Sequence, residues 1–291
     1  MKRTMIVLAA VLAAAAALAQ QDVNERRPAA KDGVVEIENV AGSVRVVGWD
    51  RLEVEVTGSL GRGTERLEFS GSPERTLIKV VLPRHAHDVD GSHLTVKVPG
   101  GSRVEANTVS ADITVEQVSG ALSLESVSGE VKASGTPIEV KASSVSGSIE
   151  ISAGTASTRV KSVSGDVTLV GAGKAVEASS VSGRVSVAGD DVENGELETT
   201  SGSIRFDASL AKNGRLDVKT VSGDAELILP ASVMADFHIS TFSGDIDNEL
   251  GPAARRSSEY GPGKELDFTT AGGGARVWVK TFSGSVSLRK K

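Results

Sequence analysis

Residues 158–170 read TRVKSVSGDVTLV, and they contain the unit from which the rest of the chain is built. Two short runs in which apolar and polar residues alternate flank a Val-Ser-Gly corner at residues 163–165. Alternation with a period of two is typical of a half-buried β-strand. The stretch therefore predicts a strand, a sharp corner and a second strand.

The corner recurs along the chain with a nearly constant spacing. Named by their glycines, its copies are Gly120, Gly129, Gly147, Gly165, Gly183, Gly202, Gly223, Gly244 and Gly284. The successive spacings are 9, then 18 three times, then 19, 21, 21 and 40 residues. A fixed period near this length is typical of stacked repeats. We therefore predict an all-β fold, a β-solenoid with two short strands per coil and an N-terminal β cap.

The chemistry of the corner suggests a role for each of its residues. Glycine adopts a positive φ without a side-chain clash, so we expect that conformation at Gly165 and its equivalents. The hydroxyl of Ser164 is expected to bond the backbone of the turn. Val163 is expected to point inward and to stack on the equivalent valines, because one coil alone cannot bury its apolar face.

The first 19 residues have the pattern of a secretory signal. Lys2 and Arg3 precede a short Ala-rich apolar run, and residues 17–19 read Ala-Leu-Ala, a small-x-small cleavage site. A retained membrane anchor is the alternative, although the run is short for a spanning helix. We predict an exported protein, periplasmic or extracellular, with no stable membrane span after cleavage.

Composition narrows the possible partners. Without residues 1–19 the chain carries 30 Lys and Arg against 38 Asp and Glu, a net charge of −8. This acidity argues against a nucleic-acid partner bound through a broad basic patch. The chain has no Cys, so no disulfide stabilises it.

The remaining chain divides into four predicted segments. Residues 20–32 are polar and predict a flexible lead, and residues 33–105 predict an N-terminal β cap over the first open edge of the stack. Residues 106–291 predict the repetitive solenoid, interrupted by an insertion at 248–266. That insertion is rich in Pro and Gly. It is either a functional protrusion or an insertion without a partner.

Three features resemble a known family. These are the Ser-Gly-Asp/Ser corners, the opening stretch IENVAGSVRVVGWD at residues 37–50, and LTVKVP at 94–99 leading into Val109-Ser110. Together they resemble the bacterial domain-of-unknown-function 4097 family, also called a putative adhesin family, over residues 33–290. The resemblance implies an exported β-solenoid of the cell envelope and brings no catalytic residues with it.

One cluster of residues could hold a metal ion. His85, His87 and His93 lie within nine residues, and the first two would share one side of a strand. With His93 or Asp88 as a further ligand, this pair could bind Zn²⁺ or Cu²⁺. The alternative is a polar hairpin loop, and we predict no cofactor.

Other candidate chemistry is weaker. Asp166, Asp224 and Asp245 follow corner glycines, but Arg184 occupies the equivalent place, so a Ca²⁺ column is not expected and these are interpreted as solvated turn residues. The many serines lack a Gly-x-Ser-x-Gly motif and are interpreted as structural. The aromatic residues that could form a sugar-binding track are scattered, and we expect Trp49 to pack in the cap and Trp278 against the last coils.

These observations favour an exported, non-enzymatic, adhesin-like structural or binding scaffold of the cell envelope. Its partner would be an envelope protein or a glycan. A polysaccharide-binding or polysaccharide-cleaving solenoid is one alternative. An accessory to an envelope stress-sensing system is another.

Overall fold

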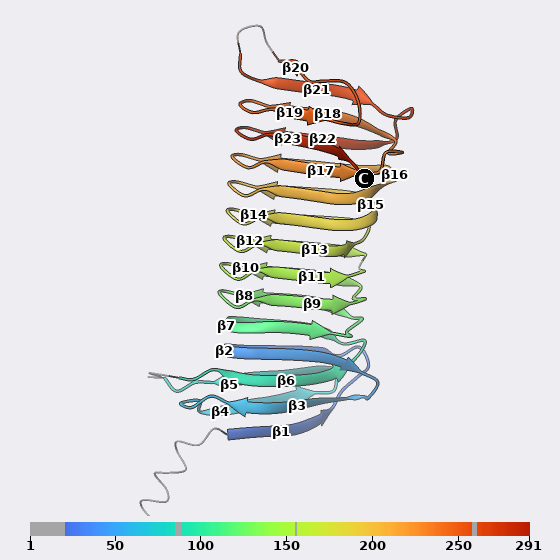
Figure 1. The fold of residues 1–291 in the computed structure, drawn as a ribbon. Coiled ribbons are helices and arrows are strands. Elements are labelled where there is room, and N and C mark those ends of the chain that lie inside the picture. Colours follow the sequence, from blue (N-terminus) through green and yellow to red (C-terminus); the bar gives the residue numbers. More distant parts are fainter. Residues whose placement is uncertain (1–20, 85–88, 155, 258–260) are drawn as a thin grey trace, which may run out of the picture.

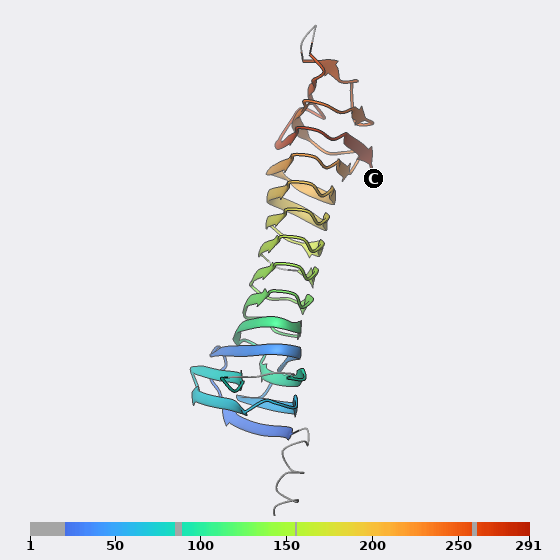
Figure 2. The same ribbon diagram turned by 90° about the vertical axis from the view of Figure 1, so that its left-hand side faces the viewer.

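The computed structural model describes residues 21–84, 89–154, 156–257 and 261–291, so the predicted signal segment lies outside it. Within these ranges the regular structure is all β. Twenty-three strands join in a single, mostly parallel sheet. Figure 1 shows the strands as rungs of a tall stack, and Figure 2 shows that the stack has two layers. No helix in the described residues is long and apolar enough to cross a bilayer.

The central rungs follow the 18-residue period. Strands β8 (Ala121–Ser126), β10 (Glu139–Ser144), β12 (Ser157–Ser162) and β14 (Ala175–Ser180) precede the corners and pair in parallel with one another. Strands β9 (Val131–Gly135), β11 (Ile149–Ala153) and β13 (Val167–Ala172) follow the corners and pair likewise. We call these the pre-corner and post-corner layers. Residues paired across neighbouring rungs are 18 apart in sequence, as in Val140↔Thr158.

The core lies between the two layers. Alternate residues of each strand are buried, as the period-two pattern predicts. Val160 of the pre-corner layer and Val167 of the post-corner layer are both 0% exposed. Strands β15 (Val185–Thr199) and β16 (Ile204–Thr220) are long enough to contribute to both layers, and Phe206 lies fully buried in the second of them.

The expectation that the corner valines point inward is wrong for five of the six Val-Ser-Gly corners; only Val118, at the Gly120 corner, is buried, at 1% exposed. The residues Val127, Val145, Val163, Val181 and Val221 are between 44% and 48% exposed. The reason is the alternation of buried and exposed positions along the strand. In β12 the last two buried residues are Val160 and Ser162, so Val163, the next residue, faces solvent. The aliphatic core is built by the strands, and the valines form an outward column on one side of the stack.

The serine that stabilises each corner is also not the expected one. The hydroxyl of Ser162, which precedes the corner, accepts the Gly165 backbone N–H at 2.9 Å. Ser126, Ser144 and Ser180 do the same at their corners, and Thr199 and Thr220 replace serine in the same role. These hydroxyls are buried, so each pairs a backbone donor that the turn would otherwise leave unsatisfied.

The corner glycines are required by close approach, because none of them has a positive φ. A Cβ on Gly165 would lie 2.1 Å from the Gly147 carbonyl oxygen, and one on Gly183 would lie 2.1 Å from that of Gly165. Gly120 does not belong to this column. It lies at the opposite end of its rung, where its Cβ would meet the Ser102 carbonyl at 2.1 Å.

The N-terminal region differs from the predicted boundaries. Strand β2 (Val34–Trp49) pairs in parallel with β7 (Arg103–Glu116) over nearly its whole length, so it is the first rung of the stack, and the expected boundary at 105 falls inside β7. Strands β5 (Arg75–Val81) and β6 (Ser92–Pro99) pair with the other edge of β2. Strand β4 (Arg66–Ser72) pairs with β5.

Residues 20–32 are not a flexible lead over their described part. Strand β1 (Gln21–Pro28) pairs antiparallel with β3 (Glu53–Leu60), which pairs antiparallel with β6. Val23 is 7% exposed, so this polar strand has one apolar anchor. Its backbone covers an edge of β3 that would otherwise be open, which explains why so polar a segment is ordered.

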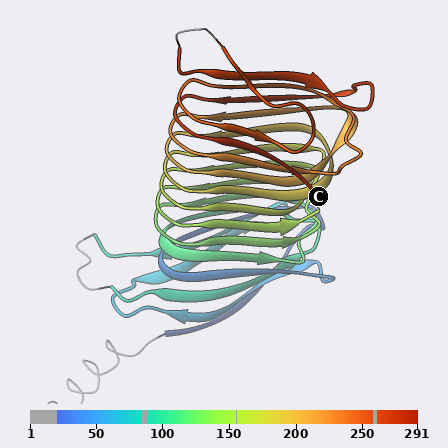
Figure 3. The ribbon, with the colours of Figure 1, turned by 45° about the horizontal axis from the view of Figure 1, so that its top comes forward.

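At the C-terminal end, chain order and spatial order differ. Strands β17 (Ala225–Leu229), β18 (Ala235–Thr241) and β19 (Ile246–Asn248) are followed along the chain by β20 (Arg255–Arg256), β21 (Lys264–Thr269), β22 (Ala275–Thr281) and β23 (Val286–Lys290). However, β22 pairs in parallel with both β16 and β18, and β23 with both β17 and β19. The last coil is therefore inserted between two earlier ones (Figures 1 and 3).

The predicted insertion at 248–266 covers an edge over part of its length. Strand β21 pairs antiparallel with β18, and the short β20 pairs with β21. Phe268 of β21 stacks on Phe237 of β18, with ring centroids 4.6 Å apart. The two strands therefore close the terminal edge of the pre-corner layer.

Candidate functional site

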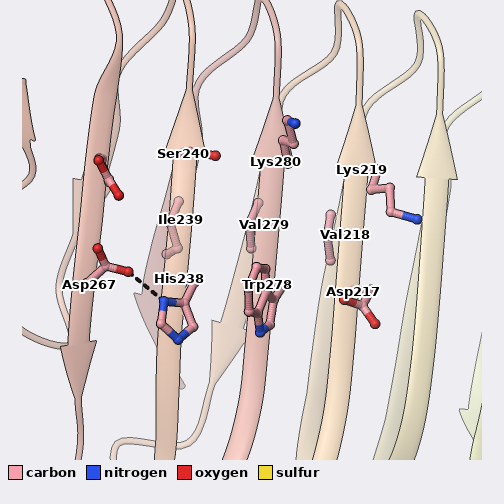
Figure 4. A pocket seen from close by; sticks show the side chains of 11 residues that line it. Asp217, Val218, Lys219, His238, Ile239, Ser240, Asp267, Trp278, Val279 and Lys280 are labelled. Carbon is pink, nitrogen blue, oxygen red and sulfur yellow. Dashed lines mark hydrogen bonds and ion pairs between the residues drawn. The ribbon is translucent and has the colours of Figure 1, made fainter. Parts of the chain in front are cut away.

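A hollow of about 500 Å³ opens on the outer side of the pre-corner layer, near the C-terminal end of the stack. Four adjacent strands form it in the order β16, β22, β18 and β21 (Figure 4). The outward side chains that line it include Asp217, Lys219, His238, Asp267, Trp278 and Lys280. Because every second residue of a strand points outward, these side chains form rows that cross the strands.

The first row has an aromatic centre. Strand pairing places Asp217, Trp278, His238 and Asp267 side by side. The His238 Nδ1 and an Asp267 carboxylate oxygen are 2.6 Å apart, and the His238 ring lies 4.8 Å from the Trp278 ring, tilted by 39°. Trp278 is nevertheless 53% exposed, so one face of its indole is available to a ligand.

The second row contains two lysines opposite each other, Lys219 of β16 and Lys280 of β22. Lys219 lies 2.6 Å from Glu198 and 3.3 Å from Glu196. The hydrogen bond to Glu198 raises the pKa of Lys219, so this lysine stays charged and bound to its carboxylates. In the first row, Asp217 lies 2.5 Å from Arg215.

A second hollow of about 480 Å³ adjoins the first and shares Lys219 and Lys280 with it. Phe282, at the corner that follows β22, lines this hollow and is 57% exposed. Its ring stacks on that of Phe242, with centroids 4.9 Å apart. The two hollows together expose aromatic surface on both sides of the lysine pair.

The sequence-predicted metal site is only partly described. His85 and His87 lie outside the described residues, and His93 Nδ1 is 2.9 Å from the Ser43 hydroxyl. Among the described residues no group of three or more His, Cys, Asp or Glu side chains is arranged to hold a metal ion. The prediction of a three-histidine site therefore stays a prediction.

The corner carboxylates have a structural role that the sequence interpretation missed. Asp166 Oδ1 accepts the backbone N–H of Arg184 at 2.7 Å, and Asp224 Oδ1 accepts that of Ser285 at 2.8 Å. Each carboxylate bonds to the next rung of the stack. This arrangement explains why Arg184 is tolerated in the same column, since its backbone is the donor.

The expectation for Trp49 is confirmed. That for Trp278 holds in part, because its ring contacts His238 of β18 but remains 53% exposed. The Trp49 Nε1–H donates to the Glu53 carbonyl at 2.9 Å within the N-terminal region. Trp278 instead stands on the outer face. The signal was present in ARVWVKT at 275–281, where Val277 and Val279 occupy the buried phase and Trp278 shares the outward phase with charged residues.

The Toastrack DUF4097 family matches residues 88–171 and 172–289, which is most of the chain. The chain belongs to this family. The resemblance to the domain-of-unknown-function 4097 family, which the sequence motifs indicated, is thereby confirmed.

Solved structures resemble this member of the family at low sequence identity. A putative adhesin from Parabacteroides merdae is 11% identical, with 92% of this chain and 96% of that chain covered and a TM-score of 0.50. A putative adhesin from Bacteroides fragilis is 10% identical, with coverages of 93% and 98% and a TM-score of 0.49. A putative lipid binding protein from Parabacteroides distasonis is 12% identical, with coverages of 93% and 97% and a TM-score of 0.49. A comparison with curated proteins gave no match.

Proposed function

We propose that this Toastrack DUF4097 protein is an exported, non-enzymatic β-solenoid scaffold of the bacterial envelope, adhesin-like in that it binds a partner through its outer face. The observation that carries the proposal is Trp278, a large aromatic side chain that remains 53% exposed beside a hollow of about 500 Å³. The name given to the Parabacteroides merdae structure, a putative adhesin, supports the same kind of role.

The setting of Trp278 suits binding rather than core packing. The strand that carries it is held between β16 and β18 by parallel pairing on both edges, so the indole stands on a rigid base. Large aromatic side chains dominate binding energies when a partner covers them. A scaffold of stacked rungs also presents a long, flat surface, which fits contact with an extended partner.

The proposal is tested by retention of the purified chain on immobilised bacterial envelope fractions. We expect Trp278→Ala to reduce retention about tenfold or more, since burying an aromatic side chain contributes roughly 2 kcal/mol or more to binding. Ile138→Ala is the matched control, because Ile138 is an exposed apolar residue, at 66%, far from the hollow. Equal retention of both variants and the unaltered chain would refute a role for this face.

A further inference from the structure

The outward residues of β22 combine aromatic and cationic groups. Arg276, Trp278 and Lys280 all point away from the core, and Phe282 follows at the corner. Neither Arg276 nor Lys280 forms an ion pair with any residue that the structure describes, although many of the other exposed cations do. This strand therefore presents two uncompensated positive charges, one on either side of Trp278.

The carboxylates nearest to this strand have other partners. Asp217 lies 2.5 Å from Arg215, and Asp267 lies 2.6 Å from His238. Asp236, which lies opposite Arg276 in the strand pairing, accepts a hydrogen bond from Thr269 at 2.6 Å. Glu265 lines the hollow from β21, two strands away from Lys280, and is separated from it by Ser240.

Lys280 occupies an electrostatically unfavourable position on its strand. It lies directly opposite Lys219, and like charges opposite each other on neighbouring strands destabilise a sheet. Lys219 is drawn toward Glu198 on its other side, and Figure 4 shows its amine directed away from Lys280. An anionic group bound at Lys280 would relieve this repulsion.

Aromatic surface flanks the lysine along the same strand. Trp278 lies beside the first hollow and Phe282 beside the second, and Lys280 lines both. Trp278 and Phe282 are four positions apart along the chain, which corresponds to about 13 Å between their Cα atoms at about 3.3 Å per residue. Along the strand, an aromatic ring, a lysine and a second aromatic ring follow one another. An extended chain of sugar rings that carries anionic groups matches this order.

We infer that the outward face of β22 binds an acidic glycan, an inference that rests on the proposed binding role. Pyranose rings stack on Trp278 and Phe282 through their apolar C–H faces. A carboxylate or sulfate of the glycan pairs with Lys280, and a second pairs with Arg276. Glu265 and Asp267 accept hydrogen bonds from sugar hydroxyls. The chain as a whole has a net charge of −6, so general attraction of a polyanion does not explain binding.

The test compares matched charged and neutral probes on the purified chain. Dextran sulfate and oligogalacturonate are titrated beside unmodified dextran, with binding followed by fluorescence. The chain has two tryptophans, so Trp49→Phe leaves Trp278 as the only indole reporter. We expect the two acidic probes to change the Trp278 emission and to bind more weakly as salt is raised, because exposed charges are screened within about 8 Å at physiological ionic strength.

Two substitutions locate the binding. We expect Lys280→Ala and Trp278→Ala each to weaken binding of the acidic probes about tenfold, as for the loss of a charge-assisted bond or an aromatic contact. Binding to Trp278→Ala, which lacks the indole reporter, is measured by titration calorimetry beside the unaltered chain. Lys161→Ala is the control, because Lys161 occupies the same row of outward residues four strands away. It should bind as the unaltered chain does.

Each contrary result has a separate meaning. Equal binding of dextran and dextran sulfate would overturn the acidic preference. Binding of the acidic probes that is insensitive to Lys280→Ala would overturn this site. If no glycan binds while envelope retention still depends on Trp278, the glycan inference fails and the proposed function stands with a protein or lipid partner. If retention does not depend on Trp278, the proposed function fails as well.

Discussion

Substitution of Gly165 by alanine tests whether close packing between rungs is what requires glycine at the corners. The added Cβ would lie 2.1 Å from the carbonyl oxygen of Gly147 and 2.6 Å from its carbonyl carbon. Both atoms are backbone, so no side chain is able to move aside, and the two rungs have to separate by about 1 Å to reach an ordinary contact distance.

That separation would stretch the backbone hydrogen bonds that join these two rungs beside the corner. Ser164 N donates to the Val145 carbonyl at 2.9 Å, and Val163 N donates to the Ser144 carbonyl at 3.3 Å. Overpacking costs about 1–3 kcal/mol and each weakened hydrogen bond about 1 kcal/mol, so we expect a loss of about 3 kcal/mol. At about 2–4 °C per kcal/mol for a chain of this size, the Tm should fall by about 6–12 °C.

The assay is thermal unfolding of the purified protein. The loss of β-sheet is followed by far-ultraviolet circular dichroism. Gly154→Ala is the control, because a Cβ at Gly154 has no atom within 4 Å, and its Tm should be nearly unchanged. Gly165→Asn separates the two explanations for the glycine. Asparagine tolerates positive φ, so it would be accepted if φ were the requirement, whereas a steric requirement makes it at least as harmful as alanine.

Gly165→Ala with a Tm within about 1 °C of the unaltered chain would refute the steric account, since that corresponds to less than about 0.5 kcal/mol. An equal fall for Gly154→Ala would refute it as well, because the loss would then reflect glycine replacement in general.

Two further predictions concern the corner hydroxyl and the order of the coils. Ser162→Ala should lower the free energy of unfolding by about 1–3 kcal/mol in chemical denaturation, because it leaves a buried N–H unpaired, and Ser162→Thr should restore stability, since threonine serves at other corners. A Glu226→Cys, Ser287→Cys pair should form a disulfide on oxidation, because these residues are neighbours across β17 and β23. A Glu226→Cys, Asp247→Cys pair should stay reduced on a non-reducing gel, because β23 lies between β17 and β19; a disulfide there would contradict the inserted coil.

The repeating unit could be predicted from the amino-acid sequence alone. The period of 18 residues and the alternation in segments such as residues 158–170 specify short strands with one buried side, and parallel stacking of equivalent strands follows because a single coil buries too little apolar surface. The family assignment also followed from these local motifs. Local patterns suffice here because each rung contacts mainly the rungs next to it.

Two features of the corners became clear only from the tertiary structure. These are the direction in which the valines point and the reason for the glycines. The Val163 column faces outward because Ser162 occupies the last buried position of its strand. Glycine is required at position 165 because the Gly147 carbonyl lies close by on the neighbouring rung, and the local sequence gives no sign of this contact.

The candidate site depends most strongly on the long-range arrangement. Trp278 and His238 are 40 residues apart in sequence, and they meet only because the last coil is inserted beside an earlier one. The alternation of ARVWVKT indicates that Trp278 points outward, but it carries no information about which strands lie on either side. Pairing between distant strand edges sets that order, and it thereby places Lys280 opposite Lys219 and forms the hollow.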